Sequence, residues 1–392
     1  MVDLLLLTLL LAAVAIGWWL GRRERSGPAT PPASPTLAKD YFTGLNYLLN
    51  DQQDRAIETF VAALEVNSET IETHITLGNL FRTRGEADRA VKIHQNLLAR
   101  PALTVPQSDR VQLELSRDFL KLGLLDRAER LLKHLVRDTS DEEIRLSARH
   151  LLADLLEREG EWKEALEAAQ PLLHRDEDLR RAAAHWLCEQ ADRERHTASP
   201  GPARKHLRQA LATDERCVRA NLLLAGLEHD TAHYKKEIRL LKRIPEQDPA
   251  FTPTILPPLA QAYRLIGDED ELIAYLRQLL EQTPYTSVII MLAEALRQRD
   301  GLPAAIELVS AQLNREPNLG GVDYLMDLYG HQGQGDPDER LVLLKQHTHT
   351  LLQALPRHRC RRCGFTGEHL HWQCPRCRSW GSTKPITGIK GE

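Results

Sequence analysis

The sequence predicts an all-α protein, in which a long solenoid of helix pairs lies between an N-terminal transmembrane helix and a small C-terminal metal-binding domain. Three observations predict this fold class: an uncharged run at residues 4–20, a repeat with a period near 34 residues, and four cysteines between residues 360 and 377. The composition agrees, because 42% of the 392 residues are hydrophobic but only 5% are aromatic, whereas sheet-rich cores favour aromatic side chains. The formal net charge of −4 is small for this length and does not by itself point to a nucleic-acid partner.

The N-terminal run reads "LLLLTLLLAAVAIGWWL" over residues 4–20. As a helix it would reach roughly 26 Å at about 1.5 Å per residue, close to the hydrocarbon thickness of a bilayer, about 30 Å. A secretory signal peptide cleaved after Ala15 is the alternative, but such peptides begin with basic residues, and only residues 1–3, "MVD", precede this run. We therefore expect an uncleaved transmembrane anchor over residues 1–21.

The flanking residues predict the orientation of this anchor. Arg22, Arg23 and Arg25 follow the run, and Trp18 and Trp19 stand where aromatic residues meet lipid headgroups. The positive-inside rule then places the chain after the anchor in the cytoplasm. A basic juxtamembrane segment and flexible linker, rich in Pro, Ser and Thr, is expected over residues 22–36. Because the cytoplasm is reducing, the cysteines are expected as thiols or metal ligands and not as disulfides.

From residue 37 the chain repeats itself. Aligning the first two repeats superimposes Gly44 on Gly78 and Ala56 on Ala90 at a separation of 34 residues. Small residues continue this register at Gly44, Gly78, Ser116, Ala153, Ala191, Ala225, Ala260 and Ala293. Twelve residues after each of these stands a second marker: Ala56, Ala90, Ala128, Ala165, Ala203, Glu237, Leu272 and Ala305. Facing small residues let two antiparallel helices approach closely, so each repeat is predicted to be a helix pair.

The spacing matches the tetratricopeptide pattern of about 34 residues per helix pair. Glycines are placed at the predicted corner between the two helices at Gly85, Gly123, Gly160 and Gly267, and prolines end repeats six to eight at Pro249, Pro284 and Pro317. Repeat five departs most, with "HTASPGPA" at its corner, and a partial ninth pair is expected over 321–355. We therefore expect a solenoid of eight to nine repeats over 37–355, the alternative being an unrelated helical bundle. Such solenoids bind other proteins along an extended face.

The solenoid sequence contains no motif for catalysis: no phosphate-binding glycine loop, no His-Glu-x-x-His and no nucleophile elbow. We therefore expect a protein that is not an enzyme. The histidines are scattered, and His74, His94 and His185 stand at helical positions that favour a packed or solvated imidazole. Cys188 and Cys217 are interpreted as small buried apolar residues within helices.

The C-terminal cysteines form two Cys-x-x-Cys pairs separated by ten residues. These are Cys360 with Cys363 and Cys374 with Cys377. Two such turns can close a tetrahedral site for one metal ion, zinc or iron, with the intervening residues as a short hairpin; a thioredoxin-like dithiol is the less specific alternative. Gly364 allows the tight turn after the first pair, and the 356–392 domain is too small to fold without its metal.

The surroundings of the cysteines are aromatic and basic. Phe365, Trp372 and Trp380 are expected to pack around the metal. Basic residues outnumber the single acid, Glu368, between residues 357 and 390: Arg357, Arg359, Arg361, Arg362, Arg376, Arg378, Lys384 and Lys390. Part of this charge compensates a tetrathiolate cluster of net charge −2, and the remainder is available for an acidic partner, anionic lipid or, less expectedly, nucleic acid.

The whole chain resembles the lipopolysaccharide assembly protein B family of Gram-negative bacteria. The resemblance is most specific at the two ends, in "GWWLGRR", the first two repeats, "CRRCGF" and "WQCPRCRSW", whereas repeats three to eight match only as generic repeats. It implies a cell inner-membrane adaptor with a cytoplasmic solenoid, a rubredoxin-like domain packed against it, and metal ligands at the four C-terminal cysteines. No nucleic-acid partner is expected.

The family resemblance also implies partners. Such proteins restrain lipid A synthesis by promoting degradation of the committed-step UDP-acyl-GlcNAc deacetylase through a membrane-anchored AAA+ protease of the FtsH family, and they gather other lipopolysaccharide assembly proteins at the membrane lipid. Arg378 stands where rubredoxins usually carry glycine, which argues for a structural ion and against electron transfer. The alternatives are a membrane-tethered rubredoxin-type electron carrier and a repeat scaffold with unrelated clients.

Overall fold

The computed structural model of the protein describes residues 71–101, 103–195, 200–331 and 339–387, together with a few scattered positions before residue 71. These residues form two compact units, the first comprising residues up to 131 with 139–141 and the second comprising 132–138 with 142–392. The predicted anchor over 1–21, the linker over 22–36 and the first repeat with its markers Gly44 and Ala56 lie outside the continuously described ranges. None of the described helices has the length and apolar character needed to cross a membrane.

The described parts are helical until residue 353, and three short strands follow. The helices of the first unit are α4 (Ile71–Thr83), α5 (Ala87–Leu98), α6 (Val105–Lys121) and the beginning of α7 (Leu125–Asp138). The α-helices of the second unit continue with α8 (Glu142–Glu159), α9 (Trp162–Ala169), α10 (Glu177–Arg195), α11 (Gly201–Thr213), α12 (Val218–Asp230), α13 (Tyr234–Lys242), α14 (Ile244–Gln247), α15 (Thr252–Ile266), α16 (Glu269–Gln282), α17 (Thr286–Asp300), α18 (Leu302–Arg315), α19 (Leu319–Gly330) and α20 (Glu339–Gln353). Two single 3₁₀ turns, η1 (Gln170–Leu172) and η2 (Pro249–Phe251), interrupt them.

The helices pair in the predicted register. The corner between the two helices of a repeat falls seven residues after the small residue of the first helix, and there the backbone is left-handed at Gly85, Gly123, Gly160, Ala232 and Gly267. Ala232, with a φ of 55°, takes in repeat six the conformation that glycine takes in the others. The ninth pair, expected over 321–355, is present as α19 and α20. The tetratricopeptide interpretation is therefore confirmed for the described repeats.

Most of the predicted small residues are buried where helices meet. Ala153, Ala165 and Ala203 are fully buried, as are Ala293 and Ala305. Gly78 shows why size matters there, because a Cβ added to it would lie 2.4 Å from Nε2 of the buried His94. Ala260 differs, since it is only half-buried, and the core of repeat seven is made by Leu259, Ala262 and Tyr263.

The first unit also contains a buried polar cluster. Nδ1 of His94 lies 2.5 Å from Oδ2 of Asp118, and both side chains are fully buried. The other oxygen of Asp118 accepts a hydrogen bond from Arg82 at 2.8 Å, and Arg82 also contacts Glu114 at 2.7 Å. The cluster ties the helix pair α4 and α5 to α6, and it satisfies charges whose burial without partners would be costly.

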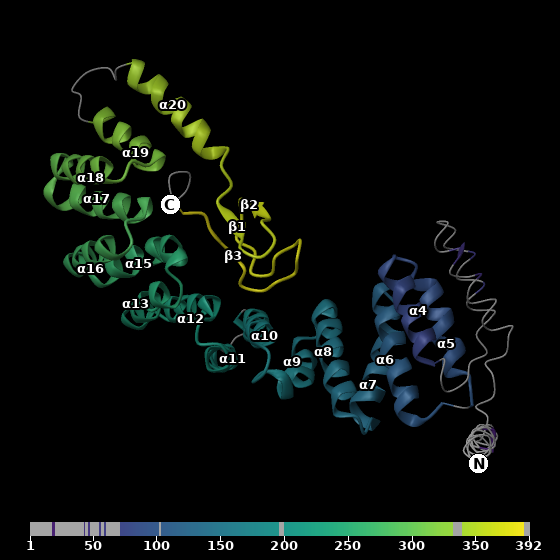
Figure 1. The fold of residues 1–392 in the computed structure, drawn as a ribbon. Helices are drawn as coiled ribbons and strands as arrows, with labels where there is room; N and C mark the ends of the chain where they lie inside the picture. The colour runs from purple at the N-terminus through teal and green to yellow at the C-terminus, as the bar shows by residue number, and fades with distance from the viewer. Residues whose placement is uncertain are drawn as a thin grey trace, which may run out of the picture. The chain divides into compact units, whose positions relative to one another are not determined.

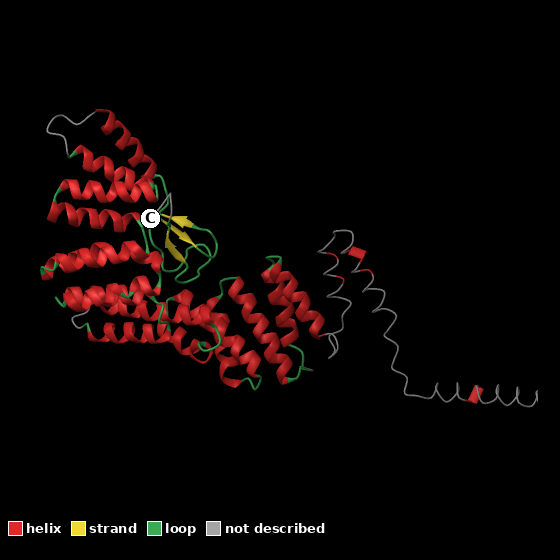
Figure 2. Cartoon of the chain, turned by 60° about the vertical axis from the view of Figure 1, so that its left-hand side comes forward, coloured by secondary structure: helices red, strands yellow, loops and turns green. Residues whose placement is uncertain are grey.

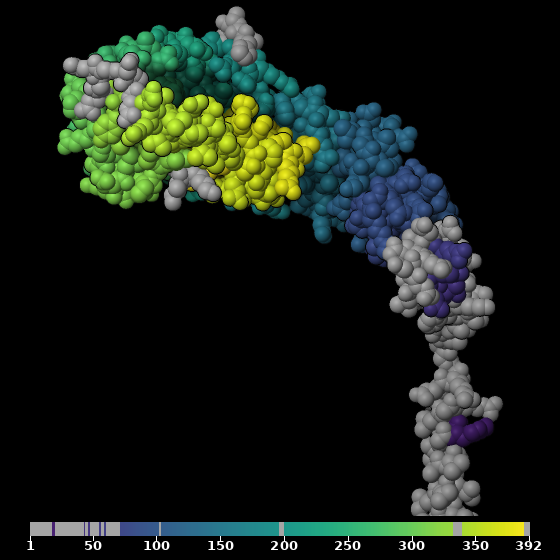
Figure 3. Space-filling view, turned by 90° about the horizontal axis from the view of Figure 1, so that it is seen from above, coloured from purple at the N-terminus to yellow at the C-terminus, as the bar shows by residue number. Residues whose placement is uncertain are grey.

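The C-terminal strands form a small antiparallel sheet in the order β2 (Thr366–Gly367), β1 (His358–Cys360) and β3 (Thr383–Pro385). After α20 the chain does not continue the stack. It turns back so that this domain lies against the second unit near α10 and α12 (Figure 1, Figure 2). In the space-filling view the domain, in yellow, covers part of the helical surface of that unit (Figure 3).

Candidate metal centre

The four C-terminal cysteines meet at one point. Their sulfur atoms all lie within 4.8 Å of one another, and the two crosswise pairs are closer, at 3.7 Å between Cys360 and Cys377 and 3.6 Å between Cys363 and Cys374. A tetrahedral ion with metal–sulfur bonds of about 2.3 Å separates its ligands by roughly 3.8 Å. The arrangement therefore fits one tetrahedral metal ion, and its sulfur-only donor set suits zinc or iron.

Two matching backbone turns position the sulfurs. The carbonyl of Cys360 accepts a hydrogen bond from the N–H of Gly364 at 3.0 Å, and the carbonyl of Cys374 accepts one from Arg378 at 2.8 Å. Both donors have left-handed backbones, with φ of 76° at Gly364 and 58° at Arg378. Gly364 therefore allows the first turn as the sequence predicts. At Arg378 the same turn is made by a residue with a Cβ, for which this conformation costs about 1–2 kcal/mol.

The strands pair around the first turn and not within the ten-residue loop. Residues 358 and 359 of β1 pair with 366 and 367 of β2, and β3 closes the other side of β1. The predicted hairpin within the loop is thus wrong, because the paired segments flank the turn at Cys360–Gly364. A bridge between Gln373 and Trp380 flanks the second turn in the same way.

The thiols differ in acidity. Burial raises the pKa of Cys360, but a hydrogen bond with the Ser382 hydroxyl and backbone N–H groups of the turn outweigh it, and the pKa is lowered to about 6. Burial raises the pKa of Cys377 to about 12. A bound cation favours the thiolate form of every ligand, so metal binding at this site is expected to release protons.

One carboxylate of the solenoid accepts several hydrogen bonds from the metal domain. Glu157, near the end of α8, is 9% exposed at its side chain and accepts four hydrogen bonds. Three come from the metal domain: Trp380 at 2.8 Å, Gln373 at 2.8 Å and Arg378 at 3.1 Å. The fourth comes from Trp186 of α10 at 2.9 Å. The ligand-bearing turn Cys374–Arg378 is therefore directly connected to the helices.

Aromatic rings extend this contact. The ring of Trp380 stacks on His185 of α10 with centroids 5.1 Å apart and meets Trp162 edge to face at 6.1 Å. Trp372 stacks on Phe251 of η2 at 5.6 Å. The sequence predicted only that both tryptophans pack around the metal, and the structure adds that their rings dock on the solenoid. Phe365 instead lies edge to face with His371.

His185 is neutral within this contact. It is 3% exposed, and burial, followed by the charges of Arg219 and Arg181, lowers its pKa to about 3. The backbone of Gly381 lies close to it, since an added Cβ would stand 3.1 Å from Nε2 of His185. His74 and His94 are also buried, in the first unit.

Part of the predicted excess positive charge forms ion pairs with acidic residues of the same chain. Arg378 pairs with Glu157, Arg362 lies 3.4 Å from Asp178, and Lys384 pairs with Asp248. Lys390 lies outside the described residues. Less of this charge is therefore available for an acidic partner or lipid than the sequence suggested.

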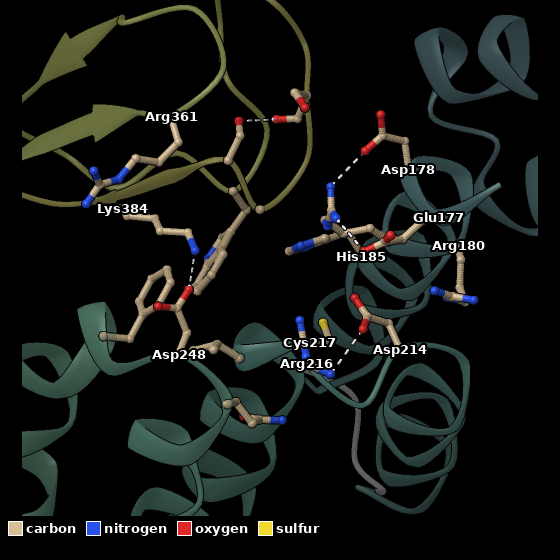
Figure 4. Close-up of a pocket in the computed structure, with 18 of the residues that line it drawn as sticks. Glu177, Asp178, Arg180, His185, Asp214, Arg216, Cys217, Asp248, Arg361 and Lys384 are labelled. Atoms are coloured by element: carbon tan, nitrogen blue, oxygen red, sulfur yellow. Dashed lines mark hydrogen bonds and ion pairs between the residues drawn. The ribbon is translucent and has the colours of Figure 1, made fainter.

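A polar cavity of about 540 Å³ lies between the metal domain and α10, α12 and η2 (Figure 4). Arg361 and Lys384 of the metal domain line it, together with Asp178, His185, Cys217 and Asp248 of the solenoid. Cys188 and Cys217 are both buried, as expected, but Cys217 precedes α12 and is not within a helix.

Comparison with known proteins agrees with these features. A family model described as a rubredoxin metal binding domain matches residues 358–385. Over 393 residues the chain is 34% identical to lipopolysaccharide assembly protein B of Escherichia coli strain K12, with all of both chains covered. The protein of the same name from Haemophilus influenzae is 34% identical over 401 residues, with 99% of each chain covered. The chain belongs to the lipopolysaccharide assembly protein B family.

Among solved structures, a tetratricopeptide repeat protein from Parabacteroides merdae is 14% identical, with a TM-score of 0.34, and the match covers 72% of this chain and 100% of that one. The relatives are named as assembly proteins. The described residues of this chain form a repeat solenoid followed by a C-terminal zinc-ribbon or rubredoxin-type domain that could bind one metal ion.

Sequence reasoning located the cysteines of this lipopolysaccharide assembly protein B family member but missed the groups that dock the metal domain. Glu157 and His185 stand in ordinary helical repeats, and no local motif distinguishes them. The one available signal lay in the metal domain, where Gln373 and Arg378 are directly beside ligands and Trp380 is three residues after the last one.

Proposed function

We propose that this protein is a non-catalytic adaptor of the cell inner membrane that restrains lipopolysaccharide synthesis. It presents the committed-step deacetylase of lipid A synthesis to a membrane-anchored AAA+ protease of the FtsH family and brings other lipopolysaccharide assembly proteins together. Full-length membership of the lipopolysaccharide assembly protein B family supports this proposal. A repeat solenoid supports it as well, because such stacks offer extended surfaces for protein partners.

The observation that carries the proposal is the use of the metal turn as a docking element. Arg378, directly after the last cysteine, and Trp380 both bond to Glu157 of the solenoid. A metal ion held by Cys360, Cys363, Cys374 and Cys377 would fold a turn whose side chains complete a surface with the helices. This favours a structural ion in a binding protein over a membrane-tethered electron carrier.

Membrane attachment is part of the proposal. The uncharged run at 4–20 would anchor the protein, and the arginines after it would keep the solenoid on the cytoplasmic side. An adaptor held in the same membrane as a protease meets it at a higher effective concentration than a free one does.

Crosslinking in living cells tests the proposal. A photoreactive amino acid is placed at Arg361 or at Arg216, exposed residues that line the cavity between the metal domain and the solenoid. The matched control carries the same group at Lys235, which is exposed on α13. We expect mass spectrometry to find the deacetylase or the protease attached at the first two positions and depleted at the control.

Capture of only unrelated proteins at all three positions would support the generic scaffold and contradict the proposal. The electron-carrier alternative predicts a different result on purified protein, namely visible thiolate-to-iron absorption with reversible one-electron reduction.

A further inference from the structure

The pair Cys188 and Cys217 has no part in the metal centre or in its docking. Their sulfur atoms lie 3.9 Å apart although 28 residues separate them in the chain. Cys188 is on α10, one turn after His185, and Cys217 is the N-cap residue of α12. Both belong to one hydrophobic cluster with residues of α11. The fold of repeat five and the start of repeat six therefore place two thiols in contact.

The two thiols differ in access and in acidity. Both thiols are buried, with Cys217 2% exposed, but only Cys217 is among the residues that line the polar cavity beside the metal domain (Figure 4). A hydrogen bond from Cys188, against the effect of burial and with help from the N–H of Ala220, lowers the pKa of Cys217. Burial and the neighbouring Cys217 raise the pKa of Cys188. The thiol nearer the cavity is thus the better nucleophile.

We propose that Cys188 and Cys217 form an oxidisable dithiol, in which a hydroperoxide entering the cavity oxidises Cys217 and Cys188 then resolves it as an intramolecular disulfide. The sulfur atoms need to approach from 3.9 Å to about 2.05 Å, a shift that side-chain rotation and small helix movements can supply. The disulfide would join α10 to the start of α12, one helical turn from His185, on whose ring Trp380 stacks.

The chemistry balances with the hydroperoxide as the only co-reactant. The Cys217 thiolate attacks one peroxide oxygen, so that an S–O bond forms, the O–O bond breaks and the other oxygen leaves as water after taking up a proton. The Cys188 sulfur then attacks the sulfenic sulfur of Cys217, forming the S–S bond while the S–O bond breaks and a second water leaves with the Cys188 proton. Two thiols are oxidised and one molecule of hydrogen peroxide is reduced to two of water.

Peptide mapping of the full-length, zinc-loaded protein tests this proposal. The protein is treated with hydrogen peroxide, free thiols are blocked with N-ethylmaleimide during unfolding, and the chain is digested with trypsin without reductant. We expect a crosslinked species joining residues 182–193 to 217–219, which reductant converts to the separate peptides. The zinc content reports on the four ligand cysteines, which are expected to remain reduced under peroxide doses that produce the crosslink.

Two variants test the order of the steps. In Cys188→Ala the sulfenic acid on Cys217 has no resolving thiol, so dimedone should label Cys217. In Cys217→Ala, dimedone labelling of the buried Cys188 should be at least about tenfold lower. Circular dichroism checks that both variants are folded.

If the unsubstituted, zinc-loaded protein keeps both thiols free under peroxide doses that oxidise free glutathione completely, the pair is only a packed element of the core and the proposal is wrong. Equal dimedone labelling of the two variants would contradict the assigned roles. The crosslink in the unsubstituted protein needs no variant, so it decides the main proposal even if a substitution impairs folding.

Discussion

The indole N–H of Trp380 donates a hydrogen bond of 2.8 Å to Oε2 of Glu157, across 223 residues of sequence. The same oxygen accepts from Trp186 of the solenoid at 2.9 Å. One buried carboxylate of α8 is therefore shared between α10 of the next repeat and the metal domain. Since a buried acceptor with satisfied partners is costly to disturb, this contact should determine whether the domain stays docked.

Replacing Glu157 with Gln should undock the metal domain without unfolding the repeats. The amide keeps one oxygen, but its NH₂ group faces N–H donors. Each buried donor left without an acceptor lowers the stability of the docked state by about 1–3 kcal/mol. We expect faster proteolysis after about Leu355 with unchanged far-UV circular dichroism. The control is Glu164→Gln, at an exposed position of α9. Identical digestion of the two variants would show that Glu157 does not hold the domain.

Replacing Cys374 with Ser should remove the metal and loosen the C-terminal domain while the repeats stay helical. Three remaining ligands bind more weakly, and the turn that carries Gln373 and Arg378 loses its support. We expect stoichiometric metal loss, little change in circular dichroism, protease sensitivity after about Leu355, and accumulation of the deacetylase in cells. Cys217→Ser, outside the metal site, should keep its metal. Normal deacetylase turnover with an empty site would show that the domain is dispensable.

Replacing Arg378 with Gly should separate metal binding from docking. Glycine adopts the left-handed backbone at φ 58° without strain, so metal affinity should be unchanged or higher. Each 1.4 kcal/mol of strain energy removed would raise the affinity by up to about tenfold. The charged hydrogen bond to Glu157 is lost, so the domain should dock more weakly. Metal competition titration and limited proteolysis measure the two effects. Arg376→Ala, at an exposed residue of the same turn, should change neither. A loss of metal affinity in the glycine variant would contradict this account of the turn.

Acid should weaken docking through His185. Its pKa is lowered to about 3 in the folded protein from an ordinary value of 6.5. Between pH 3 and 6.5 the undocked or unfolded state therefore binds more protons than the docked state does. Stability of the docked state should therefore fall as the pH decreases from about 6.5 toward 3, and rise with pH across the same window. We expect His185→Gln, which cannot titrate, to show a shallower pH dependence of tryptophan fluorescence than the unsubstituted protein. Equal slopes would exclude His185 as the cause, because protonation of the thiolates contributes equally to both proteins.

Membrane attachment should be required for regulation but not for folding. A form beginning at Leu37 lacks the uncharged run and its arginines, so we expect it to fold and bind metal but to lose most control of the deacetylase. A reporter fused after Glu392 of the full-length protein should be active only if it is of a cytoplasmic type. Periplasmic reporter activity would overturn the predicted orientation, and unchanged deacetylase turnover with the shortened form would overturn the requirement for attachment.

The sequence by itself determined the features that repeat or that are local. The period near 34 residues, the small residues at Gly78 and Ala153, and the glycine corners all follow from constraints within one helix pair, which recur along the described repeats. The four cysteines were equally clear, because each turn directs two sulfurs to one point within four residues.

Only the tertiary structure decided how the metal domain is used. Glu157 meets Trp380, and Cys188 meets Cys217, because the chain folds back after α20 and because adjacent repeats stack; neither pairing has a signature in its own neighbourhood. The tryptophans near the ligands were expected to pack around the metal, and only the folded chain brings their rings against His185 and Phe251 of the solenoid. Long-range contacts of this kind depend on how the whole chain packs, which local patterns of residues do not specify.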